Sequence, residues 1–244
     1  MGTKPGERVP EVFDRTFSKD LPEGFIEEAR KELYGKELKP GLHLEIGYGF
    51  DPHVKGRVFS AASPYLGIDG GTSDHIGEGV GWMDFRSKSP LLFDTLDRFK
   101  NDYADRPDRE FMQFIIADAK RMPLPDSVVT EIYMNNVLLA PGVAIRDSYN
   151  MALDMYRVLE PGGLLIISDD ERDAEKRVAP DSLRLDKTLD FVSLGMALKV
   201  AGFSQQALDV KRNCIFARKN IEHTEDGTSP HTVKTGFLQN LLRR

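Results

Sequence analysis

From residue 42 onward, short apolar runs of four to seven residues alternate with amphipathic stretches. The runs are apolar without strict alternation, so they fit strands that are buried on both faces, as in a parallel sheet covered by helices. The pattern therefore predicts an α/β fold. The predicted strands are Leu42–Ile46, Tyr65–Ile68, Met112–Ala117, Val128–Met134, Leu164–Ile167 and Cys214–Ala217.

The spacing of apolar residues predicts three helices around these strands. The first is expected to stop at Gly35 and the third at Gly202. The second is followed by Pro161, which disfavours helical geometry at the preceding residue, and Gly162 and Gly163 then allow a tight turn into the next strand. The predicted helices are Glu23–Tyr34, Asp147–Leu159 and Leu183–Ala201.

Changes in composition divide the chain into three expected parts. The stretch from Gly70 to Arg109 is too long for a single crossover and contains a helical pattern near Leu91–Tyr103, so we expect an insertion at about residues 72–109. The C-terminal part has little apolar content before Phe237. The expected parts are an N-terminal helical cap (1–41), an α/β domain (42–219) and a loosely attached tail (220–244).

The composition excludes several classes of protein. Hydrophobic residues make up 40% and charged residues 30% of the 244 residues, which is typical of a globular protein. The 39 acidic residues outnumber the 33 basic ones, and the net charge of −6 does not favour a nucleic-acid partner. Cys214 is the only cysteine, which excludes an internal disulfide and a Cys/His zinc site.

No segment of the sequence predicts a membrane span. The longest apolar runs, such as Leu164–Ile167, are far shorter than the ~20 residues that a spanning helix needs. The first residues lack the apolar core of a signal peptide. We therefore expect no membrane partner and a cytoplasmic location, and the sequence does not indicate an oligomeric state.

The first predicted strand runs into a glycine-containing loop that begins at Glu45. Gly47 and Gly49 let the backbone turn sharply and let a ligand approach without Cβ atoms in the way. A dinucleotide fingerprint would place a third glycine at Pro52, which has no N–H to offer a pyrophosphate. A carboxylate in the loop suits a cationic ligand. By itself the loop is equally compatible with a plain strand-to-helix turn.

Gly47 admits two interpretations. With a positive φ it is a turn glycine that folding requires, and with a negative φ it is a glycine that lets a ligand approach. Because the acid and the glycines suit a cationic ligand, we expect the second interpretation, in which the unliganded protein tolerates alanine.

Acidic residues also follow the next two predicted strands. Asp69 at the tip of the second strand can accept hydrogen bonds from both hydroxyls of a ribose, with a solvated acid or a helix cap as the alternative. Asp118 follows the third strand and can accept a hydrogen bond from an exocyclic amine such as that of adenine.

The order of these motifs resembles that of class I S-adenosylmethionine-dependent methyltransferases. The resemblance covers roughly residues 42 to 170 and is most specific at Y-R-V-L-E-P-G-G, residues 156–163. It implies a Rossmann-like fold with a mostly parallel sheet of about seven strands, the N-terminal cap and an insertion after the second strand. The cofactor that it implies is S-adenosyl-L-methionine. The implied activity is methyl transfer to a small-molecule acceptor.

The resemblance also implies which residues contact the cofactor. Glu45 and the two loop glycines are expected around the methionyl part, and Asn135 near its amine. Asp69 is expected at the ribose hydroxyls. Where the family often has a third glycine, this chain has Asp51. The expected cofactor-binding residues are Glu45, Gly47, Tyr48, Gly49, Asp69, Gly70, Asp118, Ala119 and Asn135.

The sequence does not assign a catalytic residue. Asn136 could orient an acceptor, and His53 or His75 could act as a base, although a lone loop histidine is more often a surface residue. Asp169–Glu171 fit a solvated acidic turn better than a metal site, so we expect no metal. Trp82–Phe85 fit a lid over an apolar acceptor and simple packing equally well.

Two other classes of function stay open at this stage. A non-catalytic module that binds the cofactor and has a regulatory or interaction role would share every motif above. A nicotinamide dehydrogenase is opposed by Pro52 and by the acid at Glu45.

Overall fold

The computed structural model describes residues 21–35, 38–47, 57–69, 101, 103–135, 145–168, 194–209 and 214–221. Residues 194–201 are helical. The elements with defined bounds are α2 (Phe25–Tyr34), β1 (Leu42–Ile46), β2 (Tyr65–Asp69), the 3-10 helix η2 (Arg109–Phe111), β3 (Met112–Ile116), β4 (Val129–Asn135), α5 (Ile145–Val158), β5 (Leu159–Ser168), β6 (Gln205–Asp209) and β7 (Cys214–Arg218).

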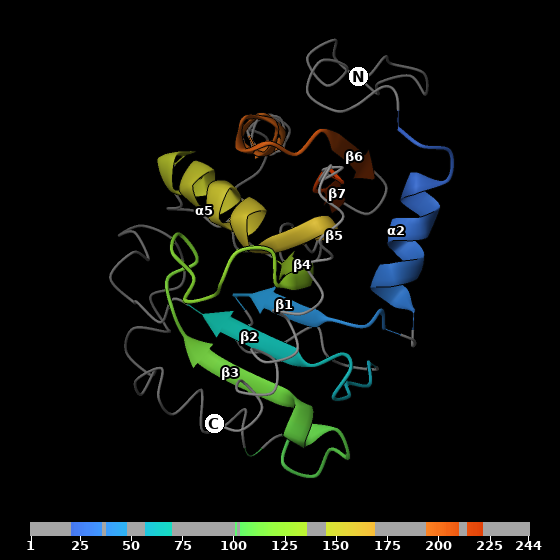
Figure 1. Cartoon of the computed structure of the whole chain (residues 1–244), viewed down its shortest axis with the longest axis vertical. Helices are drawn as coiled ribbons and strands as arrows, with labels where there is room; N and C mark the ends of the chain where they lie inside the picture. Colours follow the sequence, from blue (N-terminus) through green and yellow to red (C-terminus); the bar gives the residue numbers. More distant parts are fainter. Residues whose placement is uncertain are drawn as a thin grey trace, which may run out of the picture.

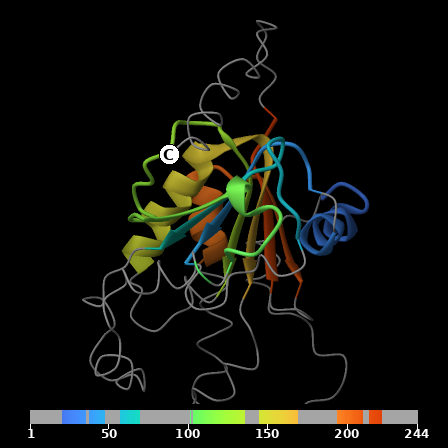
Figure 2. The same cartoon turned by 90° about the horizontal axis from the view of Figure 1, so that it is seen from below.

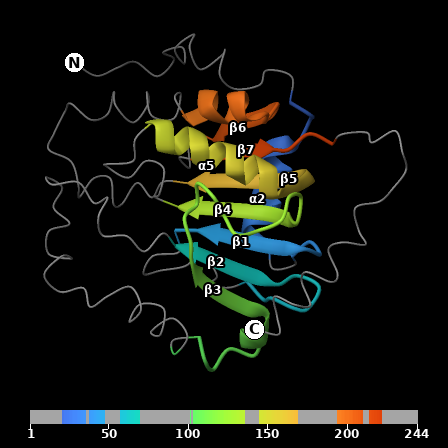
Figure 3. The same ribbon diagram turned by 60° about the vertical axis from the view of Figure 1, so that its left-hand side comes forward.

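The described strands form one seven-stranded sheet in the order β3-β2-β1-β4-β5-β7-β6 (Figure 1). All neighbouring strands from β3 to β5 are parallel. Strand β7 is antiparallel to both β5 and β6. Figure 3 shows β1–β4 side by side with their arrows pointing the same way, so their carboxyl ends meet at one edge of the sheet. This confirms the predicted mixed, mostly parallel α/β sheet.

Helices cover both faces of the sheet (Figure 2). On one face, Leu44, Ile132 and Ile167 are buried in the same core cluster as Met155 of α5 and Leu198 of the 194–201 helix. The opposite face is covered by α2, which lies across the sheet from α5 in Figure 2. The residues buried together on that side include Phe25, Ala29 and Leu33 of α2 with Tyr133, Ile166 and Phe216 of the sheet.

The six strands predicted from apolar runs are all present, with ends that differ by a few residues. The strand β6 was not among the predicted runs. It contains Gln205 and Gln206 and lies at the edge of the sheet, where one side needs no partner strand and the sequence can be more polar. An apolar-run criterion therefore misses it.

The junction between α5 and β5 differs from its prediction. The helix was expected to include Leu159, but α5 ends at Val158 and Leu159 already pairs with Val129 of β4. The next pair joins Glu131 to Leu164, so residues 160–163 bulge out of the ladder. The tight turn that Gly162 and Gly163 were expected to allow is thus a bulge inside β5, with Gly162 at a positive φ of 79°.

The predicted helix at the N-terminal side begins two residues later than expected. Gly24 adopts a left-handed conformation with φ 79° and provides no side chain to cap α2, so the helix starts at Phe25. The third predicted helix ends at Ala201 as expected, and Gly202 follows with φ 113°. Its predicted start at Leu183 lies outside the described residues.

The boundaries of the expected cap, insertion and tail stay predictions, because residues 1–20, most of residues 72–109, and residues 222–244 lie outside the described residues. In the part of the chain that the structure describes, no helix is long and apolar enough to cross a membrane.

Candidate functional site

The carboxyl edge of the parallel strands is the place where the fold favours ligand binding. The chain order reverses between β1 and β4, because β2 and β3 follow β1 on one side while β4 and β5 lie on the other. In open α/β sheets, ligands bind at such a switch point, outside the carboxyl ends of the strands.

Backbone hydrogen bonds align the ends of β1, β2 and β3. The N–H of Gly47 donates to the carbonyl of Ile68 at 2.7 Å, and the N–H of Ala117 donates to the carbonyl of Asp69 at 3.0 Å. These bonds continue the ladders past the ends of β1 and β3. They bring Gly47, the acid at the tip of β2 and the start of the 117–119 segment to one edge of the sheet.

Gly47 has a φ of 71°, in the left-handed region. Our expectation of a negative φ, and with it the expectation that the unliganded protein tolerates alanine here, is therefore wrong. The reason is local. The chain leaves β1 immediately after the Gly47 N–H has made its bond to β2, and the backbone turns there in a conformation that residues with a Cβ rarely adopt.

Asp118 organises the turn that follows β3. Its Oδ1 accepts a hydrogen bond from the backbone N–H of Lys120 at 2.8 Å, and its carbonyl accepts one from the N–H of Arg121 at 3.0 Å. The side chain is 60% exposed, with the ammonium of Lys120 3.8 Å from Oδ2. Ala119 is partly buried against the main core. The carboxylate is therefore held by its own turn and faces solvent near the carboxyl edge of the sheet.

Arg157 fixes the rest of this segment to α5. Its guanidinium donates to the carbonyls of Met122 and Leu124 at 3.0 and 2.7 Å. It also donates to Asp154 and Asp126, and the Asp154 carboxylate accepts the N–H of Met122 at 2.6 Å. The hydrogen bond with Asp154 is the main cause of a raised pKa for Arg157. Residues 122–126, which continue from the Asp118 turn, are thus held by a charged clamp.

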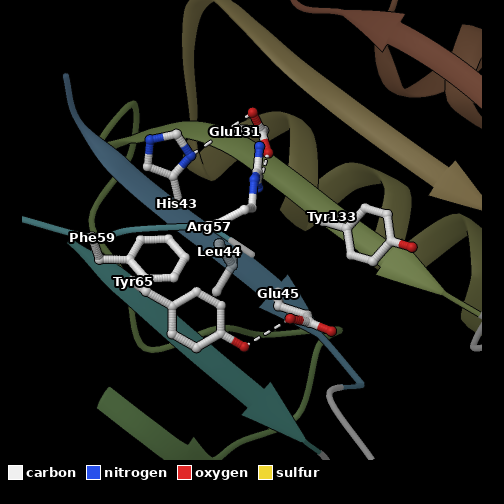
Figure 4. Close-up of a pocket in the computed structure, with 8 residues that line it drawn as sticks. All are labelled: His43, Leu44, Glu45, Arg57, Phe59, Tyr65, Glu131 and Tyr133. Atoms are coloured by element: carbon white, nitrogen blue, oxygen red, sulfur yellow. Dashed lines mark hydrogen bonds and ion pairs between the residues drawn. The ribbon is translucent and has the colours of Figure 1, made fainter. Parts of the chain in front are cut away.

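Glu45 points below the edge, into the sheet face that α2 covers. It is 4% exposed, and its Oε2 accepts a hydrogen bond from the Tyr65 hydroxyl at 2.8 Å. Figure 4 shows the two side chains turned toward each other. The same face of β1 and β4 carries Tyr133, the register partner of Glu45. Together with Arg57 and Glu131, these side chains line a small cavity.

A buried charged cluster, which the sequence did not reveal, lies in the amino half of β1 and β4 (Figure 4). The guanidinium of Arg57 donates to Glu131 Oε1 at 2.7 Å and to the carbonyl of Glu32 in α2 at 2.9 Å. His43 Nδ1 lies 3.8 Å from Glu131 Oε2, and its Nε2 lies 2.9 Å from the carbonyl oxygen of Lys39. Burial alone would raise the pKa of Glu131, but His43 and Arg57 outweigh it and hold that pKa at about 2.

Asn135 closes β4 at the site edge and is connected to β5. Its Oδ1 accepts a hydrogen bond from the hydroxyl of Ser168, its register partner, at 3.0 Å. The Ser168 hydroxyl is also 2.9 Å from the hydroxyl of Tyr133. In Figure 4 the hydroxyl of Tyr133 points away from Arg57. Its partner is thus on the β5 side.

Several residues singled out from the sequence lie outside the described residues. Among the expected cofactor contacts these are Tyr48, Gly49 and Gly70. The others are Asp51, Pro52, His53, His75, Trp82–Phe85, Asn136 and Asp169–Glu171. Within the described ranges, no three His, Cys, Asp or Glu side chains are grouped so as to hold a metal ion.

Comparisons with known proteins agree on the fold. No family model matches the sequence, and no curated protein does. The solved structure of a geranyl diphosphate methyltransferase in complex with SAM is similar with a TM-score of 0.50 and 8% identity, over 79% of this chain and 84% of that chain. The cyclase SpnF is similar with a TM-score of 0.50 and 16% identity, over 80% of this chain and 79% of that chain. The chain has the Rossmann-like fold of class I methyltransferases.

Proposed function

We propose that the protein binds S-adenosylmethionine at the carboxyl edge of β1–β4 and transfers its methyl group to a small-molecule acceptor. The observation that carries the proposal is the alignment of Gly47, Asp69 and Ala117 by hydrogen bonds at the switch point of the sheet. These bonds bring Gly47 and two acids, Asp69 and Asp118, to one edge of the sheet, where this class of fold favours a ligand.

The donors and acceptors along this edge fit the parts of the cofactor in order. The exposed carboxylate of Asp118 after β3 can accept from the exocyclic amine of adenine. Asp69, half-buried at the tip of β2, can accept from the ribose hydroxyls. The methionyl part then extends toward β1 and β4, where the buried Glu45 contributes negative charge.

The cofactor supplies an activated methyl group, and the protein has to align an acceptor and exclude water. The clamp of Arg157 on residues 122–126 keeps the Asp118 turn in place, so adenine would be held by a segment that is already ordered. A rigid nucleoside site fixes the position of the methyl-bearing sulfonium at the other end of the cofactor. The acceptor then has to be aligned with that methyl group.

Two observations support a small-molecule acceptor. The net charge of −6 disfavours a nucleic-acid substrate. The similar methyltransferase structure is named for geranyl diphosphate, which is a small molecule. The fold alone does not decide the activity, because the similar SpnF is a cyclase.

The proposal is tested by calorimetry and thermal unfolding with S-adenosylhomocysteine and, separately, NAD. We expect S-adenosylhomocysteine to bind and to stabilise the fold by about 2.7 kcal/mol at 100 times its Kd, with no effect of NAD. Asp69→Ala should weaken binding by about 1.5–3 kcal/mol, the scale of a hydrogen bond to a charged group. The matched control is Asp105→Ala, an exposed acid that precedes β3 at the opposite edge of the sheet.

Binding of NAD in place of S-adenosylhomocysteine would refute the proposal. Binding of S-adenosylhomocysteine without methyl transfer to any acceptor in broad panels would instead favour the non-catalytic binding module.

A further inference from the structure

The hydrogen bonds at the ends of β4 and β5 form a chain with a direction. Ser168 has a single hydroxyl proton, and it donates that proton to Asn135 Oδ1. The Tyr133 hydroxyl, 2.9 Å from Ser168 Oγ, must then be the donor to Ser168. All three side chains lie on one face of the sheet, because Tyr133 and Asn135 are two residues apart on β4 and Ser168 pairs with Asn135.

This chain fixes the orientation of the Asn135 amide. With Oδ1 turned toward Ser168, the Nδ2 group faces the other way and presents N–H donors at the end of β4. An amide nitrogen accepts no hydrogen bond, so this side of Asn135 can bind an acceptor but not another donor. Tyr133 is buried, which keeps the start of the chain in place.

Which ligand atom meets these donors follows from the order of the strands, and this step rests on the proposed function. With adenine beside β3 and ribose beside β2, the amino-acid end of the cofactor reaches β1 and β4. That end carries an ammonium group, which only donates hydrogen bonds, and a carboxylate, which only accepts them. The ammonium suits the negative charge of Glu45 on β1, the register partner of Tyr133.

We propose that Asn135 binds the carboxylate of the methionyl part through its amide N–H, and that Ser168 and Tyr133 are positioning residues for that amide. This reverses the contact implied by the family resemblance, in which Asn135 lies near the methionyl amine.

The test uses two ligands that differ only in the carboxylate: S-adenosylhomocysteine and S-adenosyl-3-thiopropylamine, which lacks it. Calorimetry measures both affinities for each variant. Asn135→Ala should lower the affinity for S-adenosylhomocysteine by about 10–100-fold, the range for a hydrogen bond to a charged group. It should leave the affinity for the thiopropylamine within about twofold of the wild-type value. Ser168→Ala should lower the affinity for S-adenosylhomocysteine by about 3–10-fold and leave the affinity for the thiopropylamine unchanged. Ser168→Thr, which keeps the hydroxyl, should restore the wild-type affinity for S-adenosylhomocysteine.

The chain offers a matched control. Ser204 donates to Asn220 Oδ1 in the same kind of pair. This pair precedes β6 and follows β7, at the edge of the sheet opposite the carboxyl end of β5. Ser204→Ala should therefore leave the affinities for both ligands unchanged.

Three outcomes would overturn the inference. An equal loss for both ligands in Asn135→Ala would mean a contact with the ammonium or the nucleoside, or a general structural role. Unchanged affinities in Asn135→Ala would mean that the amide touches neither ligand. A wild-type protein that binds neither ligand would overturn the proposed function together with this inference, whereas the first two outcomes leave the proposed function intact.

Discussion

The two ends of the parallel strands β1–β4 use charged side chains in different ways. In the amino half, Arg57 and Glu131 are both buried, and Arg57 Nη1 lies 2.7 Å from Glu131 Oε1, with His43 next to them. At the carboxyl edge, Asp69 is half-buried and Asp118 is mostly exposed. One group of charges is enclosed by the fold and the other faces the place where the fold favours a ligand.

The difference separates stability from binding. A buried ion pair is costly to break because the remaining charge loses its compensation in a medium that solvates it poorly. An exposed or half-buried acid costs little to remove from the folded protein, but it can make charge-assisted hydrogen bonds with a bound ligand. Changes at the amino half should therefore alter the free energy of unfolding, and changes at the carboxyl edge should alter ligand affinity.

The largest expected effect is from Glu131→Gln. Removing this charge leaves Arg57 buried without its carboxylate, which should lower the free energy of unfolding by about 3–5 kcal/mol. Urea denaturation at pH 7 measures the change. Glu110→Gln, an exposed acid in η2, is the control and should alter stability by no more than about 0.5 kcal/mol.

A second pair of variants separates the charge from the packing. Replacing both partners, in Arg57→Met with Glu131→Met, should cost clearly less than Glu131→Gln alone, because no uncompensated charge remains. A double variant that is less stable than Glu131→Gln would show that the ion pair itself stabilises the fold.

The same pair predicts how stability depends on pH. The pKa of Glu131 is about 2 in the folded protein and 4.5 as its ordinary value. Because the folded pKa is the lower one, the ionised Glu131 stabilises the folded protein fully above about pH 4.5. This stabilisation of about 3 kcal/mol is lost as the pH falls through about 2. The pKa of Asp108 is also lowered, chiefly by its hydrogen bond from Arg106. Protonation of Asp108 at low pH should therefore also reduce the stability of the folded protein.

Denaturation between pH 6 and pH 2 should therefore show a steeper loss of stability in the wild type than in Glu131→Gln. Parallel curves for the two proteins would contradict the assignment of the acid sensitivity to Glu131.

The elements at the carboxyl edge were predictable because their signals are local in the sequence. An apolar run followed by Gly47 or Asp69 defines both a strand and its end within a few residues. The conformation of Gly47 was not predictable in this way. The same glycine suits a turn or a ligand approach, and only its hydrogen bond to Ile68 in the neighbouring strand selects the left-handed backbone.

The buried cluster was not predictable because its members are far apart in the sequence. Arg57 and Glu131 are separated by 74 positions, and neither belongs to a recognisable motif. His43 and Glu131 lie inside predicted strands, where a polar residue signals only that one face is not purely apolar. Which charges meet is decided by the register of β1 with β4, and that register is a property of the folded sheet.

A further prediction concerns Arg157, whose hydrogen bonds connect the stability of the fold with the proposed adenine site. Arg157→Met should lower the free energy of unfolding by about 1–2 kcal/mol, since the partly exposed guanidinium loses hydrogen bonds to backbone carbonyls and to Asp154. It should also weaken the binding of adenosine, because residues 122–126 follow the Asp118 turn. Arg109→Met removes a comparable bond from η2 to the carbonyl of Met112, the first residue of β3, and should leave adenosine affinity unchanged.

The smallest expected effect is that of Gly47→Ala, and it tests whether one residue can serve both folding and binding. With φ at 71°, alanine should lower the free energy of unfolding by about 1 kcal/mol even without ligand. Gly24→Ala is a close match, because Gly24 has φ 79° and open space around its missing Cβ, but it precedes α2, which lies away from the carboxyl ends of β1–β3 in Figure 1. Its loss of stability measures the backbone strain alone.

Thermal unfolding of both variants with and without S-adenosylhomocysteine then separates the two roles of Gly47. If the loop contacts the ligand, Gly24→Ala keeps the full ligand-induced rise in Tm and Gly47→Ala loses part of it. If both variants keep the full rise, Gly47 serves the turn only, and the ligand is bound by the acids of β2 and the segment after β3 without help from the glycine. A loss of the rise in both variants would instead show that backbone strain alone is enough to disturb the site, because Gly24 lies away from it.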